Sequence, residues 1–207
     1  RTYTFKLIKG ELANFEIFEK KSEDLKQLFK VGDIKSRRSD KNKVVLESTN
    51  IEELVKHPLP LITKHENIEI NISTEFKNPF ADVHKDNITQ VLINLVTNAI
   101  DAMPDGGTID ISAFDTKGEI TIIVKDNGTG IEKKIINKIF EPLFTTKQIG
   151  KGTGLGLAVT YGIVKTHKGN IKVESNTDPK LGALGSKFTI KLPRKGEELN
   201  TAWIDSL

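Results

Sequence analysis

Residues 126–157 constrain the fold of this chain more than any other stretch: DNGTGIEKKIINKIFEPLFTTKQIGKGTGLGL. An apolar, strand-like segment, EITIIVKD, leads into it, and an apolar helix expected over about residues 153–168 leads out of it. Glycines lose more conformational entropy on folding than other residues, and connections of this length are uncommon in compact domains unless they are functional. We therefore expect a bound ligand to order this segment.

The second half of this stretch is rich in glycine. Gly150, Gly152, Gly154 and Gly156 lie around the expected start of the following helix. Residues without side chains allow backbone N–H groups to approach an anion closely, and a helix N-terminus adds its positive dipole end. This combination suits the phosphate groups of a ligand.

The composition sets broad limits on the class of protein. The chain of 207 residues has 31 basic and 28 acidic residues, and a net charge of +3 is too small to indicate a nucleic-acid partner. The absence of cysteine excludes disulfides and thiolate zinc sites. No run of 18 apolar residues is present to span a membrane. Because the first residue is Arg1 rather than Met, we expect a fragment of a longer protein, with any membrane anchor outside this chain. The absence of cysteine fits a reducing compartment, and we expect a cytoplasmic location.

Residues 1–35 form a zone of separate composition. Between about residues 8 and 31, apolar residues recur at roughly helical spacing among many Glu and Lys. This predicts a helix with a narrow apolar stripe, either one helix of a self-associating bundle or a surface helix packed on its own domain. Residues 32–48 are expected to be a linker that ends in a short strand, KVVLES. We divide the chain into an appendage (1–48), a main domain (49–194) and a tail (195–207).

Residues 84–103 give the clearest helix, because their apolar residues recur at helical i, i+3 and i+4 spacing. The expected buried face consists of Ile88, Val91, Leu92, Leu95, Val96, Ala99, Ile100 and Met103. The opposite stripe is polar and contains Asn87, Gln90, Asn94, Asn98 and Asp101. Such a stripe is often only a solvated face, but two Asn one turn apart can direct amide oxygens toward a hard cation.

The remaining elements indicate the fold class. Asn50 is expected to cap a helix over residues 51–57, and a strand over 68–74 should point Ile68, Ile70 and Ile72 inward. Two hairpins are expected, one over 108–114 and 119–126 and one over 170–175 and 186–193. This order predicts an α+β two-layer sandwich, with helices on one face of a mixed, mostly antiparallel sheet and an N-terminal helical appendage.

Three features taken together are more specific than any one of them: the Asn stripe, the DNGTG turn and the glycine loop. They resemble the catalytic ATP-binding domain of sensor histidine kinases, whose superfamily includes gyrase, heat-shock chaperone and mismatch-repair ATPases. NLVTNAIDAM resembles the asparagine box, DNGTGI the first glycine box, IFEPLFTTK the phenylalanine box and GKGTGLGLAV the second glycine box. The resemblance covers about residues 50–193 and is strongest to the nitrogen-regulation type of kinase.

The resemblance implies a role for each box. Asp126 would accept a hydrogen bond from the adenine amino group, and a carboxylate, which only accepts, would repel the guanine carbonyl. Asn98 would coordinate Mg²⁺, and a mobile lid would extend over about residues 140–152. Lys147 and Lys151 would meet phosphate oxygens, unless they are only solvated lid charges. The residues expected to contact ATP are Asn94, Asn98, Asp101, Asp126, Gly128, Gly130, Ile131, Phe140, Phe144, Thr145, Thr146, Lys147, Lys151, Gly152, Thr153, Gly154, Leu155, Gly156 and Leu157.

The chain departs from the family in its histidines. The family's phosphoacceptor histidine is typically followed by an acidic residue and, further on, by Asn or Arg and Pro, and none of the four histidines here, His57, His65, His84 and His167, has that full context. We expect each to be structural, and the phosphoacceptor domain to lie outside this chain or on a partner. The appendage would then be the second helix of a dimerisation bundle, which makes the parent protein a homodimer.

The resemblance implies that the domain binds Mg·ATP and transfers the γ-phosphoryl group to a histidine, for relay to a response regulator. One alternative is an ATP-gated conformational switch, as in the gyrase and chaperone ATPases. Another is a nucleotide-sensing scaffold without transfer activity.

Overall fold

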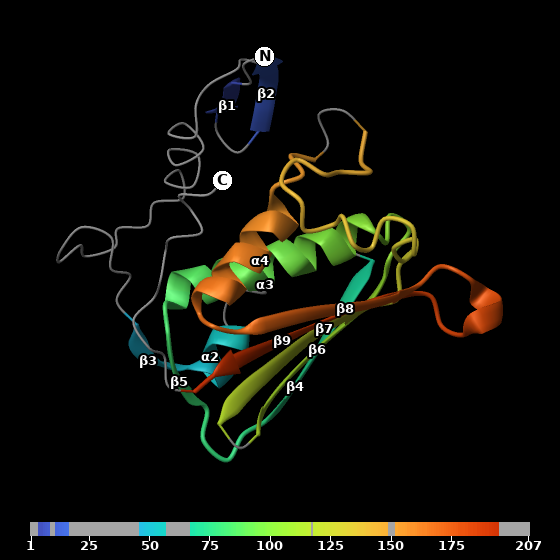
Figure 1. Cartoon of the computed structure of the whole chain (residues 1–207). Coiled ribbons are helices and arrows are strands. Elements are labelled where there is room, and N and C mark those ends of the chain that lie inside the picture. The colour runs from blue at the N-terminus through green and yellow to red at the C-terminus, as the bar shows by residue number, and fades with distance from the viewer. Residues whose placement is uncertain are drawn as a thin grey trace.

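The computed structural model describes residues 46–56, 67–116, 118–148 and 152–194, together with the backbone of two strands near the start of the chain. The main domain has two layers (Figure 1), with a five-stranded sheet on one side and helices α3 (Lys85–Asp101) and α4 (Gly156–Thr166) across one of its faces. This confirms the predicted α+β sandwich.

The sheet is mixed, with the strand order β4-β6-β7-β9-β8. Its members are β4 (Ile68–Glu75), β6 (Gly107–Thr116), β7 (Glu119–Asp126), β8 (Asn170–Asn176) and β9 (Gly185–Pro193). Only the β4–β6 pair is parallel, and both predicted hairpins, β6–β7 and β8–β9, are present. Alternation places Ile120, Ile122 and Val124 of β7 toward the helices, where each is at most 2% exposed.

Helix α3 forms as its apolar spacing predicts. All eight residues of the expected apolar face are buried, so this helix supplies much of the core between the layers. The short helix α2 (Ile51–Lys56) begins at its expected cap, because the Asn50 Oδ1 atom accepts hydrogen bonds from the N–H groups of Glu52 (3.1 Å) and Glu53 (3.3 Å).

Two short strands and one side chain differ from the sequence predictions. Strand β3 (Glu47–Asn50) overlaps the end of the expected KVVLES strand, whose first residues lie outside the described ranges, and it pairs with an unpredicted strand, β5 (Phe80–Val83). Four-residue strands are too short to show a reliable period of two, so their alternation gives no signal. Ile72 shares a face with the other isoleucines of β4 but is 37% exposed, because β4 lies at the edge of the sheet and has a neighbour on one side only.

The N-terminal helix prediction is corrected at its start. Glu11–Glu16 forms strand β2, paired antiparallel with β1 (Thr4–Ile8). Gly10, between these segments, disfavours a continuous helix and favours a turn. Residues 17–45 and the tail (195–207) lie outside the described residues, so the division of the chain into appendage, domain and tail stays a prediction.

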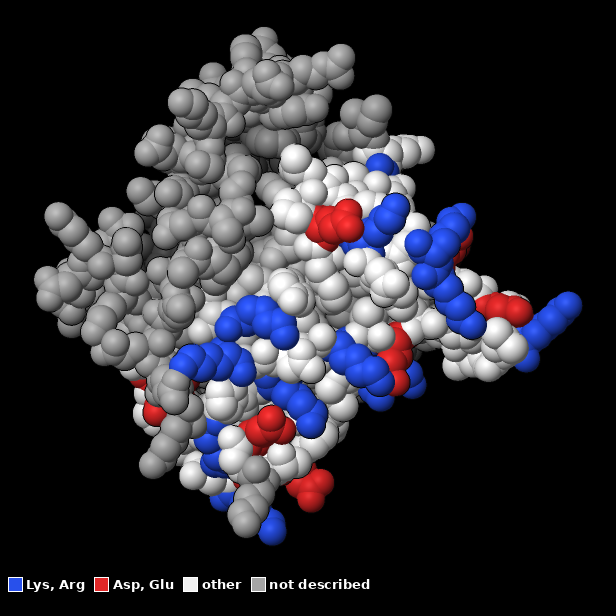
Figure 2. All heavy atoms as spheres, in the orientation of Figure 1, with Lys and Arg blue, Asp and Glu red and all other residues white. Residues whose placement is uncertain are grey.

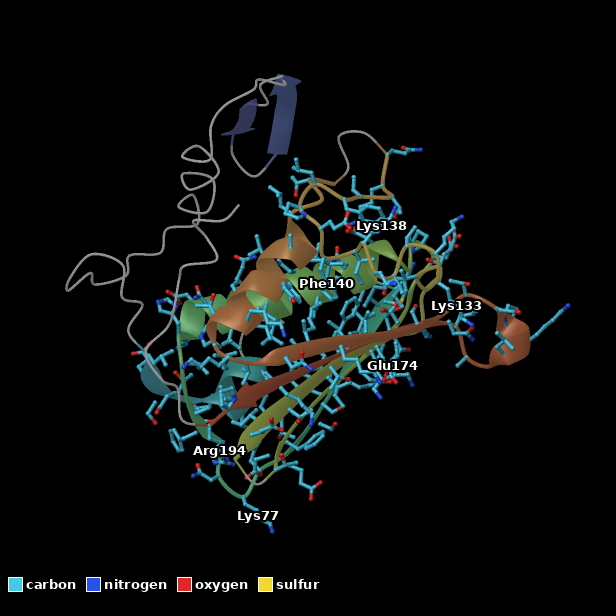
Figure 3. The ribbon with its side chains drawn as sticks, in the orientation of Figure 1. Lys77, Lys133, Lys138, Phe140, Glu174 and Arg194 are labelled. Atoms are coloured by element: carbon cyan, nitrogen blue, oxygen red, sulfur yellow. The ribbon has the colours of Figure 1, made fainter. Side chains whose placement is uncertain are left out.

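The face of the sheet opposite the helices carries charges of both signs. Glu174, labelled in Figure 3, pairs with Lys172 (3.0 Å) and Lys187 (3.2 Å). These two lysines hold the pKa of the Glu174 carboxyl below its usual value. Figure 2 shows basic and acidic side chains interspersed over the visible face.

Candidate functional site

Asp126 lies at the end of strand β7 and is only 5% exposed. Its Oδ1 atom accepts hydrogen bonds from the backbone N–H groups of Gly128 (2.9 Å) and Ser186 (3.1 Å). Burial raises the pKa of the Asp126 carboxyl, although these backbone N–H groups oppose the shift. The carboxylate is therefore fixed in orientation by one oxygen at a poorly solvated position.

The turn after Asp126 packs against the C-terminal end of α3. The Thr129 N–H donates to the Ala102 carbonyl oxygen (3.1 Å), and a Cβ atom at Gly128 would come within 2.6 Å of that same oxygen. Gly130 has a φ of 75°, and a Cβ atom there would lie 2.3 Å from the Asn176 carbonyl oxygen. Both glycines of the first glycine box are therefore required by close approach of the backbone.

Asn94 joins the two helices of the site. Its Nδ2 atom donates to the Gly156 carbonyl oxygen (2.9 Å) and to the Thr160 Oγ1 atom (3.3 Å), while its Oδ1 atom accepts from Gln90 Nε2 (2.8 Å). In this structure the Asn94 amide therefore aligns the first turn of α4 with α3. Asn98 and Asp101, further along the same stripe, make a different contact.

Lys147 reaches from the phenylalanine-box side of the site to α3. Its Nζ atom lies 2.5 Å from the Asp101 Oδ2 atom and 3.3 Å from the Asn98 Oδ1 atom. The side chains of Lys147 and Asp101 remain 35% and 42% exposed. One carboxylate oxygen and one amide oxygen thus hold a cation at the end of the polar stripe.

The phenylalanine box is anchored on α4 and on the second glycine box. The Phe140 ring, labelled in Figure 3, lies 5.3 Å from the Tyr161 ring of α4, measured between centroids. Phe144 is partly buried against the core. Gly154 has a φ of 69°, and a Cβ atom there would lie 2.5 Å from the Leu143 carbonyl carbon. The two boxes are therefore in direct backbone contact.

Helix α4 begins at Gly156, later than the expected residue 153. Its N-cap residue, Leu155, makes no side-chain cap hydrogen bond, and its first turn contains no acidic residue. The N-terminus of α4 is therefore left to other hydrogen-bond acceptors, such as an anion.

The remaining predicted site residues surround these contacts. Thr145 and Thr146 are exposed beside Lys147, whereas Ile131, Gly152, Thr153 and Leu157 are partly buried. Gly150 and Lys151 lie outside the described residues, so the structure does not test the prediction for Lys151.

The two described histidines tie helices together. The His84 Nδ1 atom accepts from the Asn87 N–H (3.4 Å) and caps α3. His167 is buried: its Nε2 atom accepts from the His84 N–H (3.1 Å), so its Nδ1–H donates to the Ile163 carbonyl oxygen (2.8 Å). Burial lowers the pKa of His167. Both contacts are structural, while His57 and His65 lie outside the described residues.

Sequence reasoning missed the contribution of the β8–β9 hairpin. The Ser186 N–H binds Asp126, and the Ser175 Oγ atom accepts from the Ile131 N–H (2.7 Å). Gly185 has a φ of 122°, and a Cβ atom there would lie 2.0 Å from the Asp126 carbonyl oxygen. Ser186 is 60 residues from Asp126 along the chain, and glycine within the hairpin was the only signal available.

Comparison with protein families identifies this arrangement. The model of the histidine kinase-, DNA gyrase B- and HSP90-like ATPases matches residues 83–196, which include every box described above. The chain belongs to this family. Among the described residues of this ATPase domain, no helix is long and apolar enough to cross a membrane.

The relatives of this ATPase domain are sensor histidine kinases. Sporulation kinase A of Bacillus subtilis is 38% identical over 154 residues, covering 73% of this chain and 24% of that protein. Sensor histidine kinase ZraS of Escherichia coli is 37% identical over 153 residues, covering 72% of this chain and 31% of that protein. The chain thus spans about a quarter to a third of the length of these relatives.

A solved structure extends the likeness to a whole domain. The catalytic domain of histidine kinase ThkA is 31% identical, has a TM-score of 0.64, and matches over 72% of this chain and 96% of the ThkA domain. The fold and the family of this chain are therefore those of histidine kinase catalytic domains.

Proposed function

We propose that this chain is the catalytic domain of a sensor histidine kinase, which binds Mg·ATP and transfers the γ-phosphoryl group to a histidine. The nucleotide would lie among Asp126, the polar stripe of α3, the N-terminus of α4 and the phenylalanine box. The observation that carries the proposal is the geometry of Asp126, an oriented and buried carboxylate at the first glycine box.

Asp126 fits an adenine amino group. Within the described part of the chain, its hydrogen bonds all end on Oδ1, which leaves Oδ2 to accept from a ligand. No buried side-chain oxygen or nitrogen among the described residues lacks a partner, so Oδ2 is open to a ligand rather than sealed in the core. Adenine supplies an N–H donor to such an oxygen, whereas guanine presents a carbonyl oxygen. Asp126 would therefore select adenine over guanine.

The phosphate side of the site fits Mg²⁺. Asn98 Oδ1 and Asp101 Oδ2 already hold the ammonium group of Lys147, so these oxygens are arranged for a cation. No group of three or more His, Cys, Asp or Glu side chains that would hold a metal occurs in the described ranges. A magnesium ion here would depend on the nucleotide phosphates for further ligands, and when bound it would neutralise charge during phosphoryl transfer. The backbone around Gly152 and Gly154, with the N-terminus of α4, would meet phosphate oxygens.

The phosphoacceptor is expected on another domain. His84 and His167 are engaged in helix contacts, so a histidine outside the described residues must accept the phosphoryl group. We propose that the acceptor domain belongs to the same protein or to its homodimer partner, and that a response regulator receives the phosphoryl group. Support comes from histidine kinase ThkA, which has been solved in complex with response regulator protein TrrA. The ThkA chain of that complex is 26% identical to this chain, with a TM-score of 0.61. The likeness to the nitrogen-regulation type stays a prediction.

The ATP-gated switch is less well supported, because the similar full-length proteins are named as kinases.

Calorimetric titration with a non-hydrolysable ATP analogue and Mg²⁺, and separately with the GTP analogue, tests the site. We expect binding of the ATP analogue only. To test transfer, the chain is mixed with the parent protein's histidine-containing domain and ATP labelled in the γ-phosphoryl group, and the label on that domain is measured. A chain that binds nucleotide but leaves every acceptor histidine unlabelled would contradict the kinase proposal and favour the switch or the scaffold.

A further inference from the structure

The contact of Lys147 with α3 places an ammonium group at the position where the proposed function requires a magnesium ion. The Lys147 ammonium group bridges Asp101 Oδ2 (2.5 Å) and Asn98 Oδ1 (3.3 Å). Asn98 is also the proposed magnesium ligand. Two cations cannot share the same two oxygens, since their mutual repulsion at such short range exceeds what one carboxylate offsets.

The position of Lys147 is supported along its whole length. Its backbone N–H donates to the Thr145 Oγ1 atom (3.2 Å), which forms a local turn. Its aliphatic stem passes Gly152 so closely that a Cβ atom there would lie 2.9 Å from the Lys147 Cδ atom. The Lys147 stem therefore lies directly against Gly152.

We propose that Lys147 is a latch for the lid, defined here as residues 140–148. Without nucleotide, its ammonium group occupies the cation position between Asn98 and Asp101 and holds the lid against α3. Binding of a metal–nucleotide displaces the ammonium group, which is then free to meet a phosphate oxygen. This inference rests on the proposed function, because it names the regulation of the same site.

The latch is weak enough to open. An ion pair that is more than a third exposed contributes little, so we expect it to favour the closed lid by about two- to fivefold. A stronger contact would prevent nucleotide from binding at ordinary concentrations, and a weaker one would leave the lid unrestrained. The latch therefore changes how often the lid opens without blocking it.

The test measures hydrogen exchange of the lid peptide in the full chain without nucleotide. Asp101→Asn and Lys147→Met should each raise its exchange rate about two- to fivefold. The double variant should exchange no faster than either single variant, because both remove the same contact. Glu119→Gln removes another exposed ion pair, with Lys191 (3.5 Å), away from the lid and should leave lid exchange unchanged.

Each outcome decides the proposal. Unchanged lid exchange in both single variants, or additive effects in the double variant, would overturn the latch. Unchanged exchange of the β7 peptide identifies the variants as folded, so a faster lid would not reflect global unfolding. Because no nucleotide is present, the result of this experiment does not depend on whether the chain binds ATP. A chain that binds no ATP analogue but shows the coupled effect would retain the latch and lose the kinase assignment.

Discussion

At the scale of single residues, Asp126 combines a functional position with a thermodynamic cost. Its carboxylate is buried, and burial raises its pKa, so the charged form is disfavoured in the folded chain. Among the described residues, the Gly128 and Ser186 N–H groups bind Oδ1, and Oδ2 remains for a ligand. Ionisable residues with shifted pKa values are common in binding sites, where a side chain keeps a functional position even though that position lowers the stability of the fold.

Asp126→Asn separates these two roles. Asparagine keeps an oxygen that can accept from the Gly128 and Ser186 N–H groups, so we expect the variant to fold. Its NH₂ group would face the adenine amino group, and two donors cannot pair. We predict at least about a fivefold loss of affinity for the ATP analogue, because an unsatisfied buried polar group costs about 1–3 kcal/mol. Calorimetry measures the affinity; unchanged binding would place adenine elsewhere.

The same variant should change the pH dependence of stability. Because the folded pKa of Asp126 is raised, the unfolded chain loses its proton first as pH increases, and this group's contribution to stability falls above about pH 4. Asp126→Asn removes this loss. We predict that its melting temperature, relative to the wild type, increases from pH 3.5 to pH 6, as measured by circular dichroism. A constant difference over this range would show that the carboxyl carries no such penalty.

Replacing each of two glycines of the site with alanine should change the free energy of unfolding in different directions. A Cβ atom at Gly128 would lie 2.6 Å from a backbone oxygen, whereas at Gly156 its nearest neighbour is a side-chain carbon 3.8 Å away. We predict that Gly128→Ala lowers the free energy of unfolding by about 1–3 kcal/mol. Gly156→Ala, at the start of α4, should leave it unchanged or raise it by up to about 1 kcal/mol. Urea denaturation measures both; equal effects would contradict the backbone placement.

At the scale of elements, helices α3 and α4 are joined at two points. Asn94 connects the middle of α3 to the first turn of α4. His167, just after α4, accepts from the backbone N–H of His84, just before α3. The second contact requires neutral His167, since a protonated ring would direct a donor at the His84 N–H.

This requirement gives a pH prediction. Burial lowers the folded pKa of His167 below its usual value of 6.5, so the unfolded chain takes up the proton first as pH falls. Stability from this group is therefore present above about pH 6.5 and is lost below it. We predict that His167→Gln has a melting temperature that varies less between pH 7.5 and 5.5 than that of the wild type. His84→Asn, which keeps a capping side chain and the backbone N–H, should retain most of the wild-type variation, because burial is the main cause of the lowered pKa of His167 and the charge of His84 is a lesser one.

How well each element could be predicted depends on its length and on the range of its contacts. Helix α3 was predicted because many apolar residues repeat one period, and the hairpins because their strands alternate over seven or more residues. Strand β5 was missed and β3 was predicted only in part, because four residues contain no usable period. The role of Ser186 at Asp126 was missed because backbone hydrogen bonds between distant segments have no residue-type signature.

At the scale of the whole molecule, the site is assembled from segments that only the complete sheet brings together. Strands β7 and β9 hold Asp126, α3 supplies the polar stripe, and α4 supplies a helix N-terminus. The buried core that joins them extends from Ile51 to Leu192. A stable nucleotide site should therefore need this core and little beyond it.

Arg194 is the last residue that the structure describes at the C-terminal end of the domain. Its guanidinium group pairs with Asp115 and donates to the Asn78 carbonyl oxygen (2.6 Å). Its backbone N–H donates to Gly118 (3.0 Å), and its carbonyl oxygen accepts from Asp82 (2.9 Å). One residue thus joins β9 to the β6–β7 turn and to β5.

We predict that a chain of residues 46–194 folds and binds the ATP analogue with the affinity of the full chain. Removing only Arg194, to give residues 46–193, should lower the melting temperature, because Asp115 and Asp82 lose their partners at the edge of the core. Starting at residue 51 should also destabilise the domain, since it removes β3 and leaves β5 unpaired. Calorimetry and thermal unfolding compare the three chains. If residues 46–194 failed to fold, a segment before residue 46 or after residue 194 would have to supply part of the core, and the boundary would move outward at that end.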